Sequence, residues 1–315
     1  MTPHLAGFVA RRALTGLLLV IVASSAALVL ARLVPGDHIG LFDVPPEVAE
    51  TERRRLGLDR PIREQYLEWV RTAARLDLGE STRYPGRRVS ALIGERAGNS
   101  ILLGTLALGL ATLLGIPLGV VTGSRMGRAA VRAAQGSSLL ILSIPPIVLA
   151  LALLVFAART GLFPVGGLPG GRSALEAARY FVLPVIALAL PAAAVLERLQ
   201  SRSLAYALGE TAIVAGRARG LPARRVVWRH AFRLSLGPVL SVYGILIGGL
   251  FSGSFVVEYV MTWPGLGRLM YDALMYRDAN LVAGCAATGA ALLACGVFLS
   301  DVARAVADPR LEERR

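Results

Sequence analysis

Long stretches without a charged residue recur along the chain and form its most regular pattern. There are six of them, at residues 13–31, 97–124, 133–158, 180–196, 234–257 and 279–300. A transmembrane helix needs about 20 predominantly apolar residues to cross roughly 30 Å of hydrocarbon, and five of the six windows reach or nearly reach that length. The window at 180–196 is shorter, but the aromatic residues at its start and Arg198 after its end suit the membrane interface. The pattern predicts an all-α, polytopic membrane protein with six transmembrane helices.

The first window could instead be the core of a cleaved signal peptide, because Arg11 and Arg12 precede it. Its 19 uncharged residues exceed the about 7 to 15 of a signal core, and it continues into ARLVPGD rather than a small-x-small cleavage site. We therefore expect it to be the first membrane helix.

Arginine placement determines the predicted orientation, because positively charged residues concentrate in short cytoplasmic loops. With the N-terminus inside, seventeen arginines fall in cytoplasmic segments and five in two short outer loops. Another twelve lie at residues 32–98, where eleven acidic residues offset them. That segment exceeds the loop length of about 60 residues over which the rule applies. We therefore predict that both termini are cytoplasmic (N-in, C-in).

This orientation divides the chain into three parts. Residues 1–31 hold the N-terminus and the first helix, residues 32–98 form an extracytoplasmic loop region, and residues 99–315 form a five-helix core. The loop region contains two stretches typical of helices, PPEVAETERRRLGL and PIREQYLEWVRTAARL, with Pro45, Pro46 and Pro61 at their starts. Partner docking and simple packing over the outer mouth both remain open as its role.

The spans are rich in small residues and prolines. Gly115, Gly119 and Gly123 repeat every four residues, and Gly244, Gly248, Gly249 and Gly253 give further pairs at that spacing. Such spacing lets membrane helices approach closely, and packing within the bundle is favoured over a dedicated subunit interface. We expect the pairs Pro145–Pro146 and Pro184/Pro191 to bend or interrupt their helices.

The six windows carry no Asp, Glu, Lys, Arg or His, whereas ion-coupled transporters and membrane enzymes usually place ionisable groups at membrane depth. The sequence also lacks phosphate-binding, metalloprotease and nucleophile-elbow motifs, and its three histidines are scattered. We therefore expect no catalytic residue, no metal site and no cofactor. A self-contained secondary transporter or channel stays open as the alternative to a subunit of a larger transporter.

Among its 315 residues the chain has no lysine, so its net charge of +13 comes from arginine, and five arginines crowd the stretch AGRARGLPARRVVWRHAF at 215–232. The stretch lies between the fourth and fifth windows, on the predicted cytoplasmic side. Gly220 is placed as a helix stop and Pro222 as the first residue of a new helix. In that second helix, Arg225, Arg229 and Arg233 share one face, while Val227 and Ala231 lie on another.

Three partners are compatible with so basic a segment. Contact with anionic lipid explains the charge but not the Gly-Leu-Pro break. Nucleic acid is disfavoured, because stacking aromatic residues are nearly absent and the chain is tethered to a bilayer. A partner protein explains both the charge and the bend.

The stretch ETAIVAGRARGLPARRVVWRHAFRLSLGPV resembles the cytoplasmic EAA-type loop of ABC-transporter permeases of the dipeptide/oligopeptide family. The matching positions are Ala215, Arg217, Ala218, Gly220, Leu221, Arg229, His230, Ala231, Arg233 and Pro238. The departures include Arg219 for the usual lysine, Gly216 for alanine and Leu234 for asparagine. Other matches to the family pattern follow in the same order along the chain: ARLVPGD, RRLGLDRPIREQYLEWV, LDLGES, LLGIPLGV, LSIPP, VVEYVMTWPGLGRLM and the terminal DPR.

The resemblance implies an ABC type I importer permease fold, with the EAA-type coupling loop at about 201–233. It implies a multi-pass subunit of a bacterial or archaeal plasma membrane, and two ATP-binding subunits that drive transport. A second homologous permease, an extracytoplasmic solute-binding protein and the lipid bilayer complete its expected surroundings. The residues expected to couple to the ATPase are Ala215, Arg217, Ala218, Gly220, Leu221, Arg224, Arg225 and His230. The residues expected to contact the binding protein are Trp263, Pro264 and Gly265.

The solute is the largest open point at this stage. Members of the family carry dipeptides, oligopeptides, nickel chelates and other small molecules, and the uncharged spans offer no specificity code. The resemblance implies di- or oligopeptides or similar small solutes, and the substrate-binding residues remain unknown.

Overall fold

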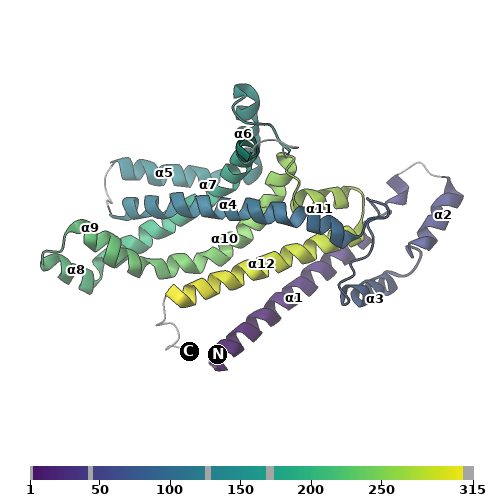
Figure 1. Ribbon diagram of the computed structural model, residues 1–315, viewed down its shortest axis with the longest axis horizontal. Helices are drawn as coiled ribbons and strands as arrows, with labels where there is room; N and C mark the ends of the chain where they lie inside the picture. The colour runs from purple at the N-terminus through teal and green to yellow at the C-terminus, as the bar shows by residue number, and fades with distance from the viewer. Residues whose placement is uncertain (1–2, 42–44, 125–128, 168–173, 308–315) are drawn as a thin grey trace. The chain divides into compact units, whose positions relative to one another are not determined.

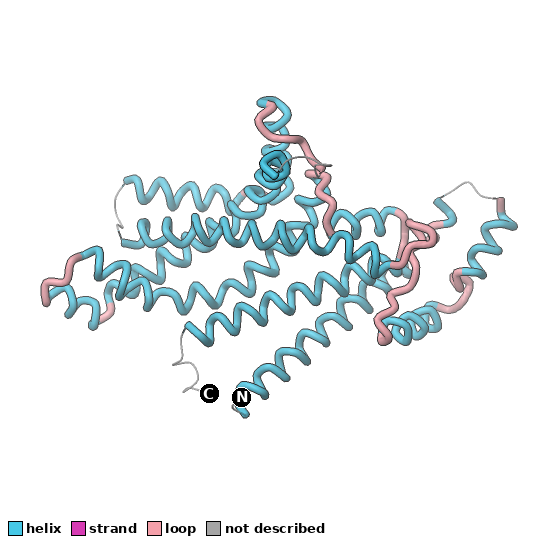
Figure 2. Tube along the Cα trace, in the orientation of Figure 1, coloured by secondary structure: helices cyan, strands magenta, loops and turns pink. Residues whose placement is uncertain are grey.

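The computed structural model describes residues 3–41, 45–124, 129–167 and 174–307. Within these ranges the regular structure is helical, and the β pairing is limited to one isolated bridge between Glu80 and Arg88 (Figure 2). The all-α prediction is therefore confirmed. Arg125, Arg128, Arg172 and the terminal DPR, which entered the sequence argument, lie outside the described residues.

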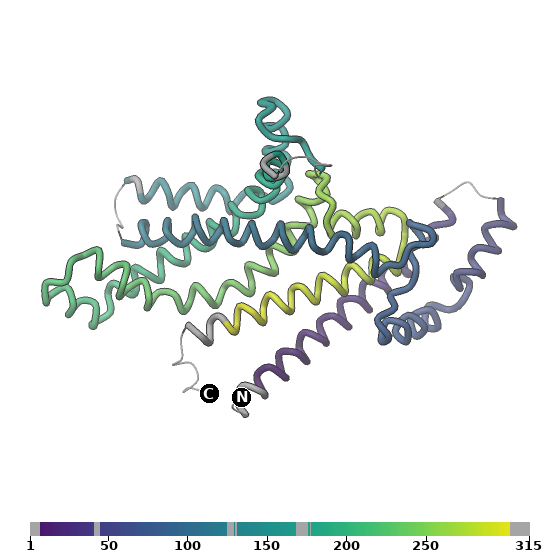
Figure 3. Tube along the Cα trace, in the orientation of Figure 1, coloured from purple at the N-terminus to yellow at the C-terminus, as the bar shows by residue number. Residues whose placement is uncertain are grey.

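The chain forms two compact units that do not follow its order. The first unit comprises residues 1–101 and 264–295, and the second comprises residues 102–263 and 296–315. In Figure 3 the first unit thus combines the purple start of the chain with a yellow-green segment near its end. The segments predicted from the sequence, by contrast, were consecutive.

The first unit contains the loop region and the helices that frame it (Figure 1). Its elements are α1 (Pro3–Leu33), η1 (Ile39–Leu41), α2 (Pro46–Arg55), α3 (Ile62–Ala73), the start of α4 (Val89–Ser124), α11 (Leu266–Met275) and the first part of α12 (Ala279–Ala307). Pro46 opens α2, and Pro61 is the residue before α3. Both helices of the loop region therefore begin where the prolines predicted them.

Asp278 organises the core of the first unit. Its fully buried carboxylate accepts hydrogen bonds from the Leu281 amide (3.0 Å), the Ser81 hydroxyl (2.6 Å) and the Arg83 amide (3.1 Å). The first of these bonds caps the N-terminus of α12, where a negative charge is favourable. The other two fasten the loop before α4 to the same point.

The second unit contains the remaining long helices and the arginine-rich segment. Its elements are the rest of α4, α5 (Ala129–Ser143), α6 (Pro146–Thr160), α7 (Ala174–Gly209), α8 (Thr211–Ala218), α9 (Ala223–Arg225), the π-helix η2 (Val226–Ala231), α10 (Phe232–Val260) and the end of α12. Figure 1 shows α8 and α9 at one end of the long helices α7 and α10.

Five helices among the described residues are long and apolar enough to cross a membrane, and α5 with α6 makes a sixth if the pair is one span. These two helices meet at an angle of 102° where Pro145 and Pro146 interrupt the third predicted span. The bend expected there is confirmed. Pro184 and Pro191, in contrast, lie inside α7, which continues through both.

The glycine repeat of α4 packs against α7. A Cβ added to Gly115 would lie 2.6 Å from the Ala193 carbonyl oxygen, and one added to Gly119 would lie 2.6 Å from the Cβ of Gln200. Gly123 is as crowded, against the backbone of Ser201 (2.5 Å). Only glycine permits this approach of two helices, so the repeat serves packing within the chain, as the sequence favoured.

Two carboxylates lie within helices whose apolar windows were free of charge. Glu197 in α7 and Glu258 in α10 are both fully buried. The charge-free windows ended at these residues, but the helices continue past them. The expectation that the spans contain no ionisable group therefore applies to the windows and is wrong for the helices.

Candidate functional site

Helix α8 ends, as predicted, just before Gly220, where two backbone hydrogen bonds form a complete C-terminal capping motif. The Gly220 amide donates to the Arg217 carbonyl (2.9 Å), and the Leu221 amide donates to the Gly216 carbonyl (3.3 Å). This pair of bonds is the Schellman arrangement, which requires a left-handed residue at the position after the cap. Gly220 supplies it with φ of +85°, a value that L side chains rarely adopt.

The glycine at 216 has a physical role in this motif. A Cβ at that position would lie 3.1 Å from Leu221 Cδ1, closer than side chains ordinarily pack. The Leu221 side chain therefore lies over Gly216, which is the apolar contact that commonly accompanies a Schellman motif. An alanine at this position would require the Leu221 methyl group to shift by a few tenths of an ångström.

A second helix leaves the turn at Pro222 and continues without interruption into α10. Pro222 is the residue before α9 rather than its first helical residue, a shift of one position from the prediction. The backbone then forms one π-helical stretch, η2, in which the Phe232 amide donates to the Val227 carbonyl. π-helical turns are rare and occur frequently at functional sites.

The inner face of the segment is anchored on the long helices of the same unit. Ala231 is fully buried in a cluster with Val120 of α4 and Leu204 and Ala207 of α7. Val227 packs at the edge of this cluster. The apolar face predicted for Val227 and Ala231 is therefore confirmed, and any movement of the segment acts directly on α4, α7 and α10.

The outer face of the segment is exposed and positively charged. Of the eight predicted coupling residues, Leu221 is half-buried, and the exposed ones are Ala215, Arg217, Ala218, Gly220, Arg224, Arg225 and His230. Among the described residues, no acidic group forms an ion pair with an arginine of this segment. The structure thus brings the predicted residues onto one surface, and within the described chain no acidic side chain is paired with the arginines of that surface.

Two large apolar side chains on this surface were missed by the sequence reasoning. Val214 is 51% exposed beside the buried Ile213, and Trp228 is 46% exposed beside the half-buried Val227. The Trp228 ring packs beside Phe232 with ring centroids 5.9 Å apart. An arginine-rich surface with an exposed tryptophan has the composition of a protein interface.

A buried polar cluster lies beside the anchored face. The Thr122 hydroxyl donates to Glu197 (2.6 Å), and the Gln200 amide donates to the Ser235 hydroxyl (2.8 Å). All four residues are buried, and they join α4, α7 and α10. The second carboxylate oxygen of Glu197 and the carbonyl oxygen of Gln200 have no partner among the described residues. The windows ended at Glu197, so the sequence analysis did not single out this cluster.

The predicted outer contact residues are mostly buried. Trp263 is 1% exposed and packs edge-on against Phe181 with ring centroids 4.7 Å apart, and Gly265 is also buried. Pro264 is half-buried, and its carbonyl accepts a hydrogen bond from Asn99 (2.8 Å). This burial favours a packing role for Trp263 and Gly265 over direct contact with another protein.

No group of three or more His, Cys, Asp or Glu side chains with the arrangement of a metal site occurs among the residues that the structure describes. What the arrangement offers is mechanical: a bent, charged outer surface joined through buried contacts to three long helices.

Comparison with known proteins gives consistent results. Residues 115–313 match the family model described as "Binding-protein-dependent transport system inner membrane component". The oligopeptide transport system permease protein AppB of Bacillus subtilis is 30% identical over 316 residues, covering 98% of this chain and 100% of that protein. The oligopeptide transport system permease protein OppB of Escherichia coli K12 is 31% identical over 306 residues, covering 96% and 98%.

A solved structure is also similar. A chain of the inward-facing MetNI methionine ABC transporter matches with a TM-score of 0.50 and 19% identity, over 68% of this chain and 94% of that one. At this identity the likeness concerns the fold alone, and it is the fold of an ABC importer.

Proposed function

Because this chain belongs to the family of binding-protein-dependent transport system inner membrane components, we propose that it is a permease subunit of an ABC importer for di- or oligopeptides or similar small solutes. It is a multi-pass membrane component without catalytic activity of its own. Family membership implies an ATPase and a binding protein as partners in general. The peptide substrate is proposed from the names of the relatives, which match over nearly their full length.

We infer that the segment from α8 to η2 transmits motion from the ATPase to the spans. The observation that carries this is its two-faced construction. Exposed arginines and Trp228 form the outer face, while Ala231 on the inner face is buried against α4 and α7. The Schellman turn at Gly220 sets the bend between the two helices of the segment. A partner that grips the outer face therefore moves the long helices to which the inner face is joined.

The chemistry of the outer face defines the partner surface that it fits. A complementary groove has acidic or polar side chains for the arginines and an apolar pocket for Trp228. We propose two ATP-binding subunits, one for this chain and one for a second, homologous permease. We propose that this face lies in the cytoplasm of a bacterial or archaeal cell, with residues 32–98 outside. The arginine distribution supports the orientation, because positively charged residues concentrate in short cytoplasmic loops.

A self-contained secondary transporter is the alternative, and the buried Glu197 and Glu258 are the groups that it would use. The two functions differ in what the isolated chain does. Purified alone in proteoliposomes, a secondary transporter moves peptide down the peptide's own gradient or together with an ion. A permease subunit on its own moves no peptide.

The test is reconstitution of the chain with its second permease and ATPases in proteoliposomes. We expect peptide uptake that requires ATP, the binding protein and all membrane subunits together. A double variant, Arg224→Glu with Arg225→Glu, should lose uptake, while Arg132→Glu, which changes an exposed arginine of α5 outside this segment, serves as the charge-reversal control. Uptake by the chain alone, or full uptake by the double variant, would contradict the proposal.

A further inference from the structure

A cavity within the first unit has the chemistry of a binding site. It measures about 410 Å³ and lies where the end of α1, the loop after it, α2, α3 and the start of α12 meet. This volume is within the range of about 300–1,000 Å³ that is usual for small-molecule sites. None of the functions assigned above uses this cavity.

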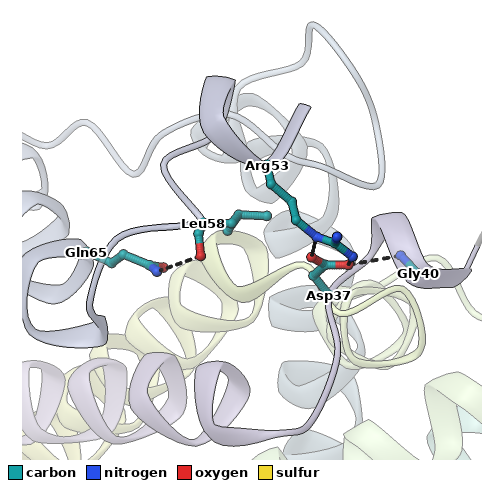
Figure 4. Close-up of polar contacts among 5 residues, drawn as sticks. All are labelled: Asp37, Gly40, Arg53, Leu58 and Gln65. Atoms are coloured by element: carbon teal, nitrogen blue, oxygen red, sulfur yellow. Dashed lines mark hydrogen bonds and ion pairs between the residues drawn. The ribbon is translucent and has the colours of Figure 1, made fainter. Parts of the chain in front are cut away.

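The charges that line the cavity do not balance. Four arginines line it (Arg32, Arg53, Arg60 and Arg277), against two aspartates (Asp37 and Asp278). Arg53 is paired with Asp37 at 2.5 Å, as Figure 4 shows, and Arg60 is paired with Glu68 at 3.2 Å. Arg32 and Arg277 have no ion pair among the described residues, and Asp278 is the one remaining carboxylate for both.

Asp278 is also committed elsewhere. It accepts the hydrogen bonds that cap α12 and hold the loop at Ser81 and Arg83. At least one guanidinium at the cavity therefore lacks a counter-charge. A partly buried positive charge is stabilised when an anion with hydrogen-bonding oxygens is placed against it.

Unpartnered polar atoms line the same cavity. The buried Arg32 Nε, Gln65 Oε1 and Thr82 Oγ1 have no hydrogen-bond partner among the described residues. The amide nitrogen of Gln65 donates to the carbonyl of Arg60 (2.8 Å). It also donates, at longer range, to the carbonyl of Leu58, and Figure 4 draws this second bond. The Gln65 carbonyl oxygen is thereby left to accept a bond from a ligand. The cavity thus offers donors for an anion and an acceptor for an N–H group.

The backbone makes room for Arg277. Gly36 has φ of +85°, and a Cβ at that position would collide with the Arg277 guanidinium. Arg277 itself has φ of +55°, which is uncommon for a residue with a side chain. Glycine at 36 is therefore required for the guanidinium to occupy its place at the cavity.

We propose that this cavity binds the C-terminal carboxylate of a peptide. The carboxylate oxygens accept N–H bonds from the guanidinium groups of Arg277 and Arg32, and the peptide's last amide N–H donates to Gln65 Oε1. Guanidinium matches a carboxylate in planar geometry, and the neighbouring acceptor selects a carboxylate that has an amide beside it. The choice of a peptide as ligand rests on the proposed function. The choice of a carboxylate rests on the unpaired arginines and the unpartnered polar atoms that line the cavity.

The test measures binding to the full chain in lipid nanodiscs, without ATPases or binding protein. Radiolabelled trialanine and its C-terminal amide are compared in saturation binding. We expect trialanine to bind at least tenfold more tightly than the amide. Arg277→Gln should weaken trialanine binding at least tenfold, while Arg71→Gln, an exposed arginine of α3 outside the cavity, should change it less than twofold.

A glycine pair tests the position of the guanidinium without changing any charge. Gly36→Ala introduces a Cβ that displaces the Arg277 side chain and should weaken trialanine binding at least tenfold. Gly86→Ala is the matched control, because Gly86 also has a positive φ (+75°) but nothing within 4 Å of an added Cβ. Binding by Gly86→Ala should stay within twofold of the unaltered chain.

Three outcomes would overturn the inference: equal binding of trialanine and its amide, equal effects of Arg277→Gln and Arg71→Gln, or no trialanine binding. If trialanine does not bind but Arg277→Gln abolishes docking of the binding protein, the carboxylate belongs to an acidic side chain of that protein. Failed uptake in the reconstituted importer, with carboxylate-dependent trialanine binding intact, would contradict the proposed function alone.

Discussion

Two arginine-rich segments of this chain stand in opposite relations to acidic side chains. At residues 32–98, twelve arginines accompany eleven acidic residues, and ion pairs such as Arg53–Asp37 and Arg55–Glu52 form within the segment. At residues 198–233, eight arginines accompany one acidic residue, Glu210, and no ion pair joins them among the described residues. The first segment neutralises most of its own charge, whereas the arginines of the second have no acidic partner within the described chain.

The two segments therefore differ in how their arginines are paired rather than in whether they contain arginine. Exposed ion pairs each contribute little to stability, because water and salt screen them. Unpaired arginines on an anchored, bent segment are available for an acidic surface. The same criterion identifies Arg277 and Arg32 as exceptions within the first segment's unit, since their charges are not balanced at the cavity.

The largest expected effect comes from the turn that orients the unpaired arginines. Gly220→Pro should reduce ATP-driven peptide uptake more than tenfold, because proline fixes φ near −65° and removes the amide that bonds to Arg217. Membrane insertion should persist, since Gly220 lies outside the long helices. ATP hydrolysis and uptake are measured together in proteoliposomes. Gly220→Asn, which tolerates a left-handed backbone, should retain most of the uptake, and unchanged uptake by the proline variant would refute the role of the bend.

Charge reversal in the two segments compares them directly. Arg224→Glu with Arg225→Glu should weaken ATPase-subunit binding at least tenfold, with a loss that shrinks as salt is raised. Arg54→Glu in α2 should change binding and uptake less than twofold, because Arg54 is exposed and its contact with Glu50 is long, at 4.0 Å. Equal losses from the two changes would mean that the contrast between the segments is wrong.

Trp228→Ala tests the apolar part of the outer face. Affinity for the ATPase subunit should fall about fivefold, since truncation of an exposed interface tryptophan commonly costs about 1 kcal/mol or more of binding. Thermal stability of the isolated chain should hardly change, because about half of the side chain is already exposed. A large fall in melting temperature with unaltered affinity would assign Trp228 to packing instead.

The smallest effect is expected for the ion pair between Arg53 and Asp37 in the first segment. The hydrogen bond from Arg53 lowers the pKa of Asp37 below its ordinary value of 3.8. Stability from this pair is therefore present above that value and is lost as the pH falls through the lower pKa of the folded chain. Asp37→Asn should lower the melting temperature by about 1–2 °C at pH 6, and the difference should shrink as the pH falls below 3.8. A difference that grows on acidification would have the wrong sign for this pair.

The sequence was sufficient for features that depend on local chemistry. The stop at Gly220 follows from the left-handed conformation that glycine alone adopts easily, and the bend at Pro145–Pro146 follows from a missing amide and a steric clash. The helix starts near Pro46 and Pro61 have the same local origin.

Features that depend on tertiary partners were not predictable. Glu197 ended an apolar window, but Thr122, far away in the sequence, donates a hydrogen bond to it inside the bundle. Trp263 looked like an outer contact residue, but Phe181 and its neighbours bury it. Trp228 has the same residue type but is 46% exposed, because Phe232 covers only part of it. Residue type does not distinguish the two tryptophans, since the packing around each one decides its exposure.

The three glycines of α4 have a consequence for how force travels. With no side chain between α4 and α7 at Gly115, Gly119 and Gly123, the two backbones interlock and leave no room for sliding past one another. We therefore expect α4 and α7 to move as a single rigid body during transport. Displacement of α8, which follows directly on α7, would then shift two membrane helices together.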